Sequence, residues 1–370
     1  MSNNEETKIT PITLDDLIQA GRSTNTARAL RGAVNHFEID FGGSLPTTPV
    51  HIEAYIEAYH TTLSPDTLRQ RLAMLATWHK RHGFPDPTKT PRLREALIGC
   101  RARYAKPKQR AKPLGLVQLE QVVASIEQRL QQAHRIGDQS RQQRALELTA
   151  IRDRCFVLIG FWCGFRSEQL LNLRVEHCEE HLSEHDVDRY ITLFLPKSKG
   201  DREAKGQTWT LREMPNDHRH LCPVNAYLDW VTASQRESGP LFSKIDRWGV
   251  VWDRPLHKNS VIALLRSILA PAGLPAEQYS SHSLRRGFAN WAVDNDSSLH
   301  DLMSWVKWKD PRSVLPYLEA RDDLPNRLLS GSAKTSFAMP QGEEPKGITV
   351  TSITPMKTLE RSPHQDDAVE

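Results

Sequence analysis

The sequence predicts a mainly α-helical protein with two domains and one small β-hairpin. Its first hundred residues carry apolar side chains at helical spacing, separated by capping residues, glycines and prolines. A basic stretch with prolines and no apolar periodicity follows at residues 106–115. Helical patterns return from residue 116 and are interrupted by two β-like runs. We therefore expect domains at 1–105 and 116–329, a basic linker between them and a flexible tail at 330–370.

The first domain is expected to be a small helical bundle. Ser64 and Pro65 give the clearest helix start, because a serine side chain caps the first turn and the proline has no N–H to leave unpaired. Leu68, Leu72 and Leu75 then follow at helical spacing and predict the buried face of this helix. The expected helices begin at Thr13, at Asn25 or Thr26, near Val50, at Ser64-Pro65 and at Pro91.

The second domain is expected to contain several helices and a hairpin. Residues 191–195 and 207–211 resemble strands and flank a polar segment, which predicts an antiparallel hairpin with a polar turn. From about residue 330 the chain is rich in Ser, Thr, Pro and Gly, which predicts the flexible tail. The helices are expected at residues 117–135, 141–163, 222–232, 258–270, 284–293, 299–306 and 311–319.

Charge is unevenly distributed along the 370 residues. The formal net charge is only +4, but residues 69–112 contain 13 lysines and arginines against two acidic residues. After Tyr317 there are 6 basic and 9 acidic residues. This asymmetry predicts a polyanionic partner that is bound by one part of the chain, and a solvated connector is the alternative explanation for the linker charges.

The composition excludes several classes of protein. With 38% hydrophobic and 25% charged residues, the chain can bury a core and is not disordered throughout. No stretch approaches the roughly 18 apolar residues of a membrane span, and the polar N-terminus does not resemble a signal peptide. The five cysteines are scattered and form no Cys-x-x-Cys pair, which favours reduced thiols in the cytoplasm over a disulfide framework.

Three polar motifs follow one another in the second domain. Arg166 lies at a helix edge after an apolar run, His282 and Arg285 share a helix face, and Trp308 precedes Tyr317 by nine residues. Each motif alone is typical of ordinary structure, namely a surface arginine, a first helical turn and a pair of core aromatic residues. Their order, with a lysine-bearing hairpin between the first and the second, favours a shared site.

With these motifs in this order, the chain resembles the tyrosine recombinase (phage integrase) family. The resemblance covers most of residues 20–320 and includes the family's helical, SAM-like core-binding domain around residues 25–31 and 64–72. It implies a C-shaped clamp on duplex DNA. It also implies a site-specific recombinase that cleaves and rejoins strands through a 3′-phosphotyrosine, for integration, excision or resolution of a mobile element.

The resemblance implies a role for each motif residue. Tyr317 would attack the scissile phosphate, and Arg166 and Arg285 would hold its non-bridging oxygens. His282 and Trp308 would donate further hydrogen bonds. Guanidinium groups suit this role because their paired donors match the charge that gathers on a phosphoryl oxygen in the transition state.

A lysine on the hairpin turn would protonate the departing 5′ oxygen. Lys199 is the first choice because it precedes a glycine in a turn like that of the family, and Lys197 is the alternative. Because the phosphotyrosine ester retains the energy of the broken bond, neither ATP, a metal nor another cofactor is implied.

The first domain and the linker are expected to hold duplex DNA mainly through phosphate contacts. Two recombining sites need four cleavages, so the resemblance implies a homotetramer on DNA, with residues 324–329 as a candidate docking segment. An accessory DNA-bending protein is a candidate partner, and no membrane is involved. The resemblance implies a cytoplasmic, nucleoid-associated protein that is encoded by a bacterium or a mobile element. The candidate DNA contacts are Arg69, Arg71, Lys80, Arg92, Arg94, Arg101, Lys106, Lys108, Arg110 and Lys112.

The sequence departs from the family's pattern at two places. Gln169 occupies a position that is usually acidic, three residues after the first arginine, with Glu168 beside it. Val306 and Lys307 replace the usual glycine-containing turn before Trp308. Gln169 supports one rival hypothesis, a catalytically weakened DNA-binding regulator on the same fold. A type IB topoisomerase that relaxes DNA without a second site is another.

A group of histidines and cysteines is a weaker candidate site. Histidines four residues apart could share a helix face and bind zinc, but the segment around residues 181–188 resembles an acidic, exposed loop before the hairpin. A solvated loop is therefore the preferred interpretation. The residues concerned are His177, Cys178, His181, His185, His218, His220 and Cys222.

Overall fold

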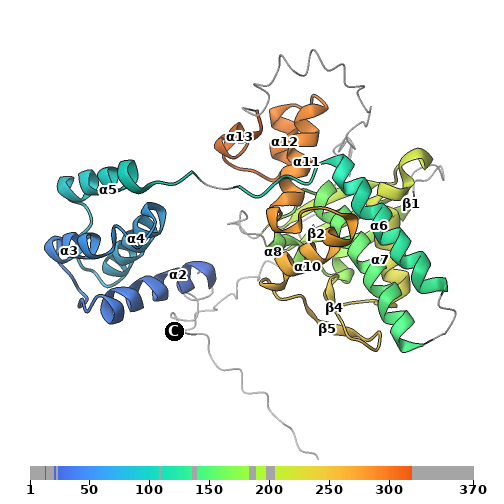
Figure 1. Cartoon of the computed structure of the whole chain (residues 1–370), viewed down its shortest axis with the longest axis horizontal. Coiled ribbons are helices and arrows are strands. Elements are labelled where there is room, and N and C mark those ends of the chain that lie inside the picture. Colours follow the sequence, from blue (N-terminus) through green and yellow to red (C-terminus); the bar gives the residue numbers. More distant parts are fainter. Residues whose placement is uncertain are drawn as a thin grey trace, which may run out of the picture. The chain divides into compact units, whose positions relative to one another are not determined.

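The computed structural model describes Thr13, Gly21 and residues 24–107, 110–135, 140–182, 189–196 and 205–318. The chain divides into two compact units, Met1–Gln109 and Arg110–Glu370 (Figure 1). Each unit has its own hydrophobic core. The predicted fold class, mainly helical with a small antiparallel sheet, is confirmed. The expected tail at 330–370 lies outside the described residues.

The first unit is helical throughout its described part. Three of its helices begin with a threonine or serine cap followed by proline, and each cap oxygen accepts a hydrogen bond from the backbone N–H three residues further on, as the Ser64 start predicts. The last turn of the first helix is a π-helix at His36–Asp40. The helices are α2 (Thr24–Asn35), α3 (Pro49–Tyr59), α4 (Pro65–Arg81) and α5 (Pro91–Tyr104).

The core of the first unit includes the three leucines that helical spacing predicts. Leu68, Leu72 and Leu75 of α4 are buried, and they pack with Phe37 and Tyr55. The short helix expected from Thr13 falls almost entirely outside the described residues. The bundle prediction is otherwise confirmed.

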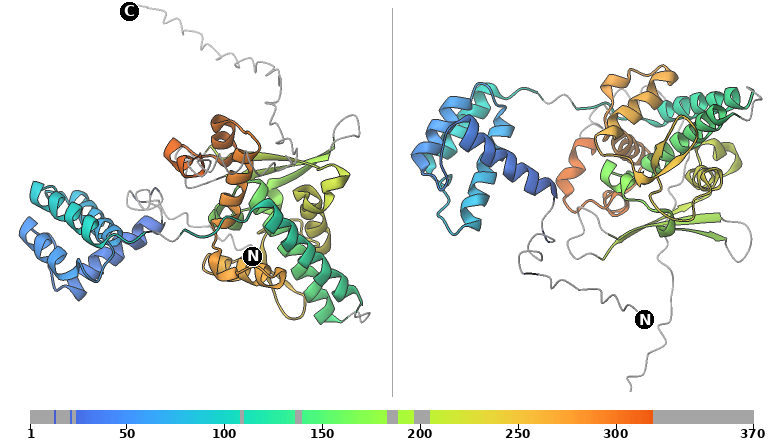
Figure 2. Two further views of the ribbon diagram at one scale, coloured as in Figure 1. Left: turned by 45° about the horizontal axis from the view of Figure 1, so that its top comes forward. Right: turned by 90° about the horizontal axis from the view of Figure 1, so that it is seen from below.

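The second unit is built around one buried helix, α7 (Arg141–Trp162), whose residues 155–162 are all buried. The helix α6 (Leu116–Arg135) runs beside it (Figure 2). The remaining helices are α8 (Ser167–Leu171), α9 (Pro223–Ser234), α10 (Ser260–Leu269), α11 (Ser283–Asp294), α12 (Leu299–Val306) and α13 (Leu315–Leu318). Short 3₁₀ turns join several of them.

The predicted hairpin forms the larger part of a three-stranded antiparallel sheet in the order β1-β2-β3. The strands β2 (Arg189–Leu195) and β3 (Gln207–Arg212) pair with Leu193 opposite Trp209. The sequence predicted an exposed loop at residues 181–188. Residues 181–182 belong instead to the first strand, β1 (Cys178–Leu182), and pair with residues 189–190 of β2.

Two further features differ from the expectations. A second small sheet, β4 (Ser243–Ile245) with β5 (Val251–Pro255), was not predicted. The helix expected at 311–319 is a 3₁₀ turn at Pro311–Ser313 followed by the one-turn α13. The proline at position 316 has no N–H, so a continuous helix through this segment would lack a hydrogen bond.

Tryptophan side chains tie the sheet to the helices. The indole N–H of Trp209 on β3 donates to the Trp305 carbonyl of α12 at 2.8 Å. The indole of Trp305 in turn donates to the Trp162 carbonyl at the end of α7, also at 2.8 Å. Buried N–H groups of this kind are costly to leave unpaired, so this chain of bonds fixes α12 between the sheet and the central helix. Among the described helices, none combines the length and the apolar character needed to cross a membrane.

Candidate active site

The turn between α7 and α8 places Arg166. Helix α7 ends at Trp162, and the chain reverses direction at Gly164, which takes a positive φ of 57°. A Cβ atom at this position would also lie only 3.2 Å from the Val306 side chain, so glycine suits the turn on both counts. Arg166 is then the N-terminal cap residue of α8 and is half-buried. Burial lowers the pKa of its guanidinium, while Glu168 opposes this shift.

Gln169 supports this turn from within. Its side chain is buried, and its Oε1 atom accepts a hydrogen bond of 2.9 Å from the backbone N–H of Arg166. The side chain therefore closes the first turn of α8 as a carboxylate at this position would, without adding a negative charge beside the arginine.

Arg285 is the most enclosed of the candidate residues. Its Nη1 atom donates to the Gly164 carbonyl at 2.6 Å and its Nη2 atom to the Val306 carbonyl at 3.1 Å. The guanidinium carbon lies 4.7 Å from the ring centroid of Trp308. Burial lowers the pKa of Arg285 to about 9, Arg166 adds to this shift, and Tyr317 opposes it. The side chain is thus held in place by the turn that precedes α8 and by the last residue of α12.

His282 lies at the N-terminal end of α11, one turn before Arg285. Desolvation by the surrounding protein lowers the pKa of His282, and the positive charges of Arg285, Arg166 and Arg286 lower it further. A neutral imidazole near pH 7 is able to accept a proton.

Trp308 and Tyr317 extend the site from the Arg285 guanidinium. Their rings stack with centroids 5.5 Å apart and an interplanar angle of 26°. Trp308 is fixed by a backbone hydrogen bond from its N–H to the Met303 carbonyl and is buried. Burial raises the pKa of the Tyr317 hydroxyl, and the positive charges of nearby arginines act in the opposite direction.

The structure thus brings five of the six expected catalytic side chains into one cluster. They come from three segments of the sequence: the turn before α8, the start of α11, and the stretch from the end of α12 to α13. The sixth, Lys199, and its alternative Lys197 lie outside the described residues. Both belong to the connection between β2 and β3, whose paired ends are Leu195 and Gln207.

Two side chains near this cluster were not predicted as site residues. Arg286 follows Arg285 directly and donates a hydrogen bond to the Ala111 carbonyl. Lys307 takes a positive φ of 54°, which explains why a glycine suits this turn, and its Nζ atom lies 5.6 Å from the ring centroid of Trp209. Burial lowers the pKa of Lys307. Only the departure at Val306-Lys307 pointed to this region in the sequence.

The expected DNA contacts lie mostly on exposed surfaces, and two of them have side-chain partners within the protein. Arg71 is half-buried and donates to the Tyr55 hydroxyl at 3.4 Å. Arg92 is exposed but forms an ion pair of 3.0 Å with Glu53. Lys108 lies outside the described residues. The other exposed residues are Arg69, Lys80, Arg94 and Arg101 in the first unit, Lys106 at its end, and Arg110 and Lys112 at the start of the second.

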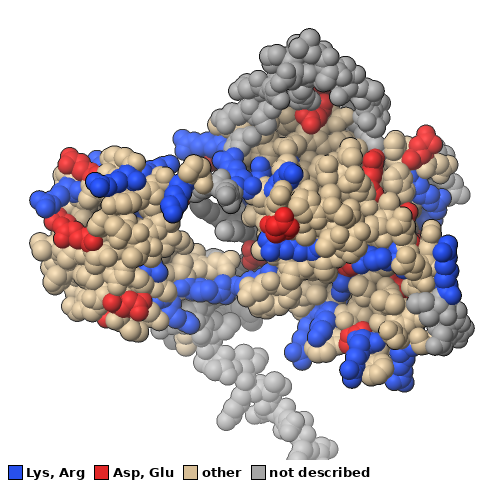
Figure 3. All heavy atoms as spheres, in the orientation of Figure 1, with Lys and Arg blue, Asp and Glu red and all other residues tan. Residues whose placement is uncertain are grey.

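The β4–β5 hairpin carries a second group of cations that sequence patterns did not indicate. Figure 3 shows lysine and arginine side chains gathered over this hairpin. Lys244 lies 4.7 Å from the ring centroid of Trp252, and Arg247 lies 4.7 Å from that of Trp248. Both tryptophans are exposed. Each strand is short and carries charged residues, so neither has the alternating apolar pattern that predicts a strand.

The histidine and cysteine group does not form the helix face that zinc binding would need. His177 ends a 3₁₀ turn, and His181 lies on β1, where its ring stacks on Tyr190 at 4.7 Å. Its Nε2 atom is 3.0 Å from the Thr192 hydroxyl. His185 lies outside the described residues. Within the described part of the chain, no three His, Cys, Asp or Glu side chains are grouped as metal ligands.

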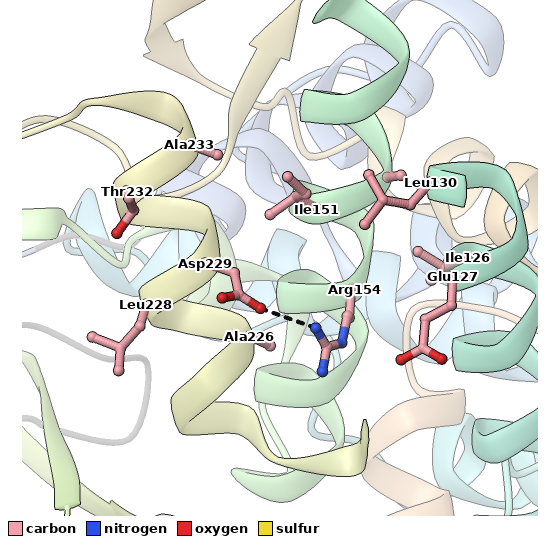
Figure 4. A pocket seen from close by; sticks show the side chains of 11 residues that line it. Ile126, Glu127, Leu130, Ile151, Arg154, Ala226, Leu228, Asp229, Thr232 and Ala233 are labelled. Carbon is pink, nitrogen blue, oxygen red and sulfur yellow. Dashed lines mark hydrogen bonds and ion pairs between the residues drawn. The ribbon is translucent and has the colours of Figure 1, made fainter. Parts of the chain in front are cut away.

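A pocket of about 440 Å³ lies between α6, α7 and α9 (Figure 4). Its walls are mainly apolar, with Leu130 and Ile151 among them. Arg154 donates to the carboxylate of Asp229 across it at 3.0 Å. The pocket shares no residue with the arginine and tyrosine cluster, so it is a feature of helix packing separate from the candidate active site.

Comparisons with known proteins agree with the resemblance. The sequence profile of the phage integrase family matches residues 129–323. A curated relative, the "Integrase/recombinase xerD homolog" of Selenomonas ruminantium, is 25% identical over 291 residues, which cover 77% of this chain and 78% of the relative.

Two solved structures share the fold. The XerH site-specific recombinase in a post-cleavage complex with a palindromic difH substrate has a TM-score of 0.52 and 16% identity, covering 83% of this chain and 78% of that one. A lambda integrase dimer bound to a COC′ core site has a TM-score of 0.50 and 13% identity, covering 82% of this chain and 91% of that one.

Proposed function

Because this chain belongs to the phage integrase family of tyrosine recombinases, enzymes that cleave and rejoin DNA at specific sites, we propose that it acts through a covalent 3′-phosphotyrosine on Tyr317. The observation that supports this proposal is the contact series from Arg285 to Trp308 and from Trp308 to Tyr317. A single phenol lies within the field of several arginines, which is the arrangement that phosphoryl transfer to a tyrosine needs.

The cleavage step exchanges one phosphoester bond for another. The Tyr317 oxygen forms a bond to phosphorus, the bond from phosphorus to the 5′ oxygen breaks, and the DNA strand stays attached to the enzyme at its 3′ end. The phenol proton passes to His282, and the departing 5′ oxygen takes a proton from Lys199, or from Lys197 as the alternative. In rejoining, a 5′ hydroxyl attacks the phosphotyrosine and the same proton transfers run in reverse.

The two arginines stabilise the charge that this step creates. A pentavalent phosphorus gathers negative charge on its equatorial oxygens, and fixed guanidinium groups stabilise this charge without reorganising at the moment of reaction. Arg285 is fixed by its two backbone carbonyl partners, which leave its remaining N–H groups for phosphate. The indole N–H of Trp308 is a further donor in this scheme.

Recombination requires more than one active site. We propose a homotetramer on two DNA sites, since four strands must be cut and rejoined, and an accessory DNA-bending protein as a further partner. Exposed arginines and lysines of both units supply phosphate contacts. The enzyme would act on DNA in the cytoplasm, associated with the nucleoid.

The test is cleavage of a suicide substrate, a duplex with a nick near the cleavage site, made from paired inverted repeats that flank the gene. We expect the wild-type chain to form a covalent complex that survives denaturation. Tyr317→Phe should form none while it retains DNA binding. Absence of the complex with wild-type protein would instead favour the regulator on the same fold, and relaxation of arbitrary plasmids would favour a topoisomerase.

A further inference from the structure

The first residues of the second unit lie across the N-terminal end of α11. The N–H of Lys112 donates to the Gln278 carbonyl at 2.8 Å, and the N–H of Leu114 donates to the Ser283 carbonyl at 3.0 Å. Leu114 is fully buried in the core of this unit. Residues 110–114, here called the strap, are therefore held against the helix that begins with His282.

The strap and α11 are in very close contact. A Cβ atom placed on Gly287 of α11 would lie 1.7 Å from the Leu114 carbonyl oxygen, a distance that no side chain tolerates. Only glycine at this position permits the strap to pass so near the helix.

Arg286 joins the strap to the active site. Its Nη1 atom donates to the Ala111 carbonyl, next to the exposed Arg110. Arg286 belongs to α11, which packs against α13, the helix that carries Tyr317. The helix that carries Arg286 therefore contacts both the strap and the helix of the nucleophile.

We propose that Arg286 is a positioning residue: by binding the Ala111 carbonyl it holds the strap against α11, so that Arg110 and Arg286 together form a cationic wall beside Tyr317. This inference rests on the proposed function of Tyr317. It makes the start of the second unit a part of the active site, at the point where the linker from the DNA-binding unit enters.

The charges around Tyr317 agree with this placement. Burial raises the pKa of its hydroxyl, and four arginines lower it: Arg286 most, then Arg285, Arg110 and Arg166. They come from α11, from the strap and from the turn before α8. Removing the Arg286 charge should raise the pKa of Tyr317, and it should raise the pKa of His282 as well. Both changes favour the protonated forms, so the cleavage rate of such a variant should reach its maximum at higher pH.

The experiment measures single-turnover cleavage of the suicide substrate against pH, with the full-length chain at saturating concentration. We expect Arg286→Gln to cleave about tenfold more slowly near pH 7, with its pH profile displaced upward by roughly one unit. Arg286→Lys keeps the charge and should keep the wild-type profile, while its rate falls because a lysine lacks the guanidinium geometry. DNA affinity should change only a few-fold in both variants.

Arg266→Gln is the matched control. Arg266 of α10 also donates to a backbone carbonyl, that of Glu277 at 3.0 Å, but it is not among the arginines that shift the pKa of Tyr317. This variant should keep the wild-type rate and profile. If Arg286→Gln does not fold, Arg110→Gln tests the same cationic wall by removing its exposed charge. This variant should shift the pH profile of cleavage in the same direction as Arg286→Gln.

A wild-type rate and pH profile for Arg286→Gln, or for Arg110→Gln where the first does not fold, would overturn this inference and leave the proposed function standing. Failure of the wild-type chain itself to form a covalent complex would overturn the proposed function instead. The two failures are therefore distinguishable in one set of reactions.

Discussion

Arg285 is held by two backbone carbonyls, so its guanidinium is in position before any DNA arrives. Arg166 differs in this respect, because it is half-buried at the start of α8 and is held through its backbone by Gln169. The site thus combines one rigid guanidinium with one on a short, capped helix. A phosphate that enters the cluster would meet donors from two segments that are far apart in the sequence.

We predict that Arg166→Gln slows single-turnover cleavage by about 10²–10³-fold, the usual cost of removing one donor to a developing oxyanion. Affinity for the DNA site should fall far less, because one phosphate contact is a small part of the whole interface. The measurement is the rate of covalent complex formation beside a binding titration at the same salt concentration.

Arg154→Gln is the control for this variant. Arg154 lies on α7 and is paired with Asp229 in the pocket of Figure 4, apart from the cluster. The Arg154→Gln substitution removes the same charge as Arg166→Gln and should leave the cleavage rate within a few-fold of wild type. A comparable rate loss in both variants would mean that general charge, and not the position of Arg166, governs the rate.

At the residue scale, the sequence predicted the cluster through motif order. Arg166, His282 and Arg285 are recognisable because their types and spacing match a known chemistry. Arg286 was missed because its relation to Ala111 depends on a tertiary contact between residues 175 positions apart. Such a contact leaves no trace in local spacing.

At the scale of elements, close packing of the strap on α11 gives a second prediction. Gly287→Ala should destabilise the second unit by about 1–3 kcal/mol, since the added methyl group collides with the Leu114 carbonyl and the strap must move. The measurement is the transition of this unit in differential scanning calorimetry. Displacement of the strap should also slow cleavage.

Gly32→Ala is the matched substitution, because Gly32 also lies within a helix, α2, and has no atom within 4 Å of an added Cβ. Alanine should stabilise that helix by about 0.5–1 kcal/mol relative to glycine. Equal effects of the two substitutions would contradict the close contact between the strap and α11.

Helices were easier to predict than strands in this chain. Caps such as Ser64 and prolines at the next position mark helix starts locally, and the structure has these helices where the sequence indicated them. The strands β1, β4 and β5 are short and carry charges on exposed faces. Each pairs with a strand close by in the sequence, β1 with β2 and β4 with β5. Their stability depends on cross-strand and packing contacts, which such short, charged sequences do not show.

At the scale of the whole molecule, positive charge is spread over both units, and this predicts a strong dependence of DNA affinity on salt. Arg94 and Arg101 lie seven residues apart on α5, on one face of the helix, and both are exposed. Replacing both with glutamine should reduce the slope of log affinity against log salt by about 2, if each contacts one phosphate. Fluorescence anisotropy over a range of salt concentrations measures this slope.

Arg92→Gln provides the comparison on the same helix. Arg92 already pairs with Glu53 at 3.0 Å, so part of its charge is neutralised before DNA binds. Its loss should change the slope by less than the loss of Arg94 or Arg101 alone. A slope that is unchanged in the double variant would remove this face of α5 from the DNA interface.

The two-unit organisation follows from a sequence feature that is independent of any motif. The basic stretch at residues 106–115 contains two prolines and has no apolar periodicity, which predicts a connection between two domains. Its last residues behave differently in the structure, because residues 110–114 join the second unit as the strap. That assignment depends on hydrogen bonds with α11, which composition does not reveal.

The central claim is that Tyr317 is the residue that becomes bonded to DNA, and peptide mapping of the covalent complex tests it most directly. Trypsin should release residues 313–321, a peptide with one tyrosine. After nuclease treatment, mass spectrometry should find a nucleotide adduct on this peptide, at Tyr317. An adduct on any other residue, or a denaturation-resistant complex formed equally well by Tyr317→Phe, would contradict the account.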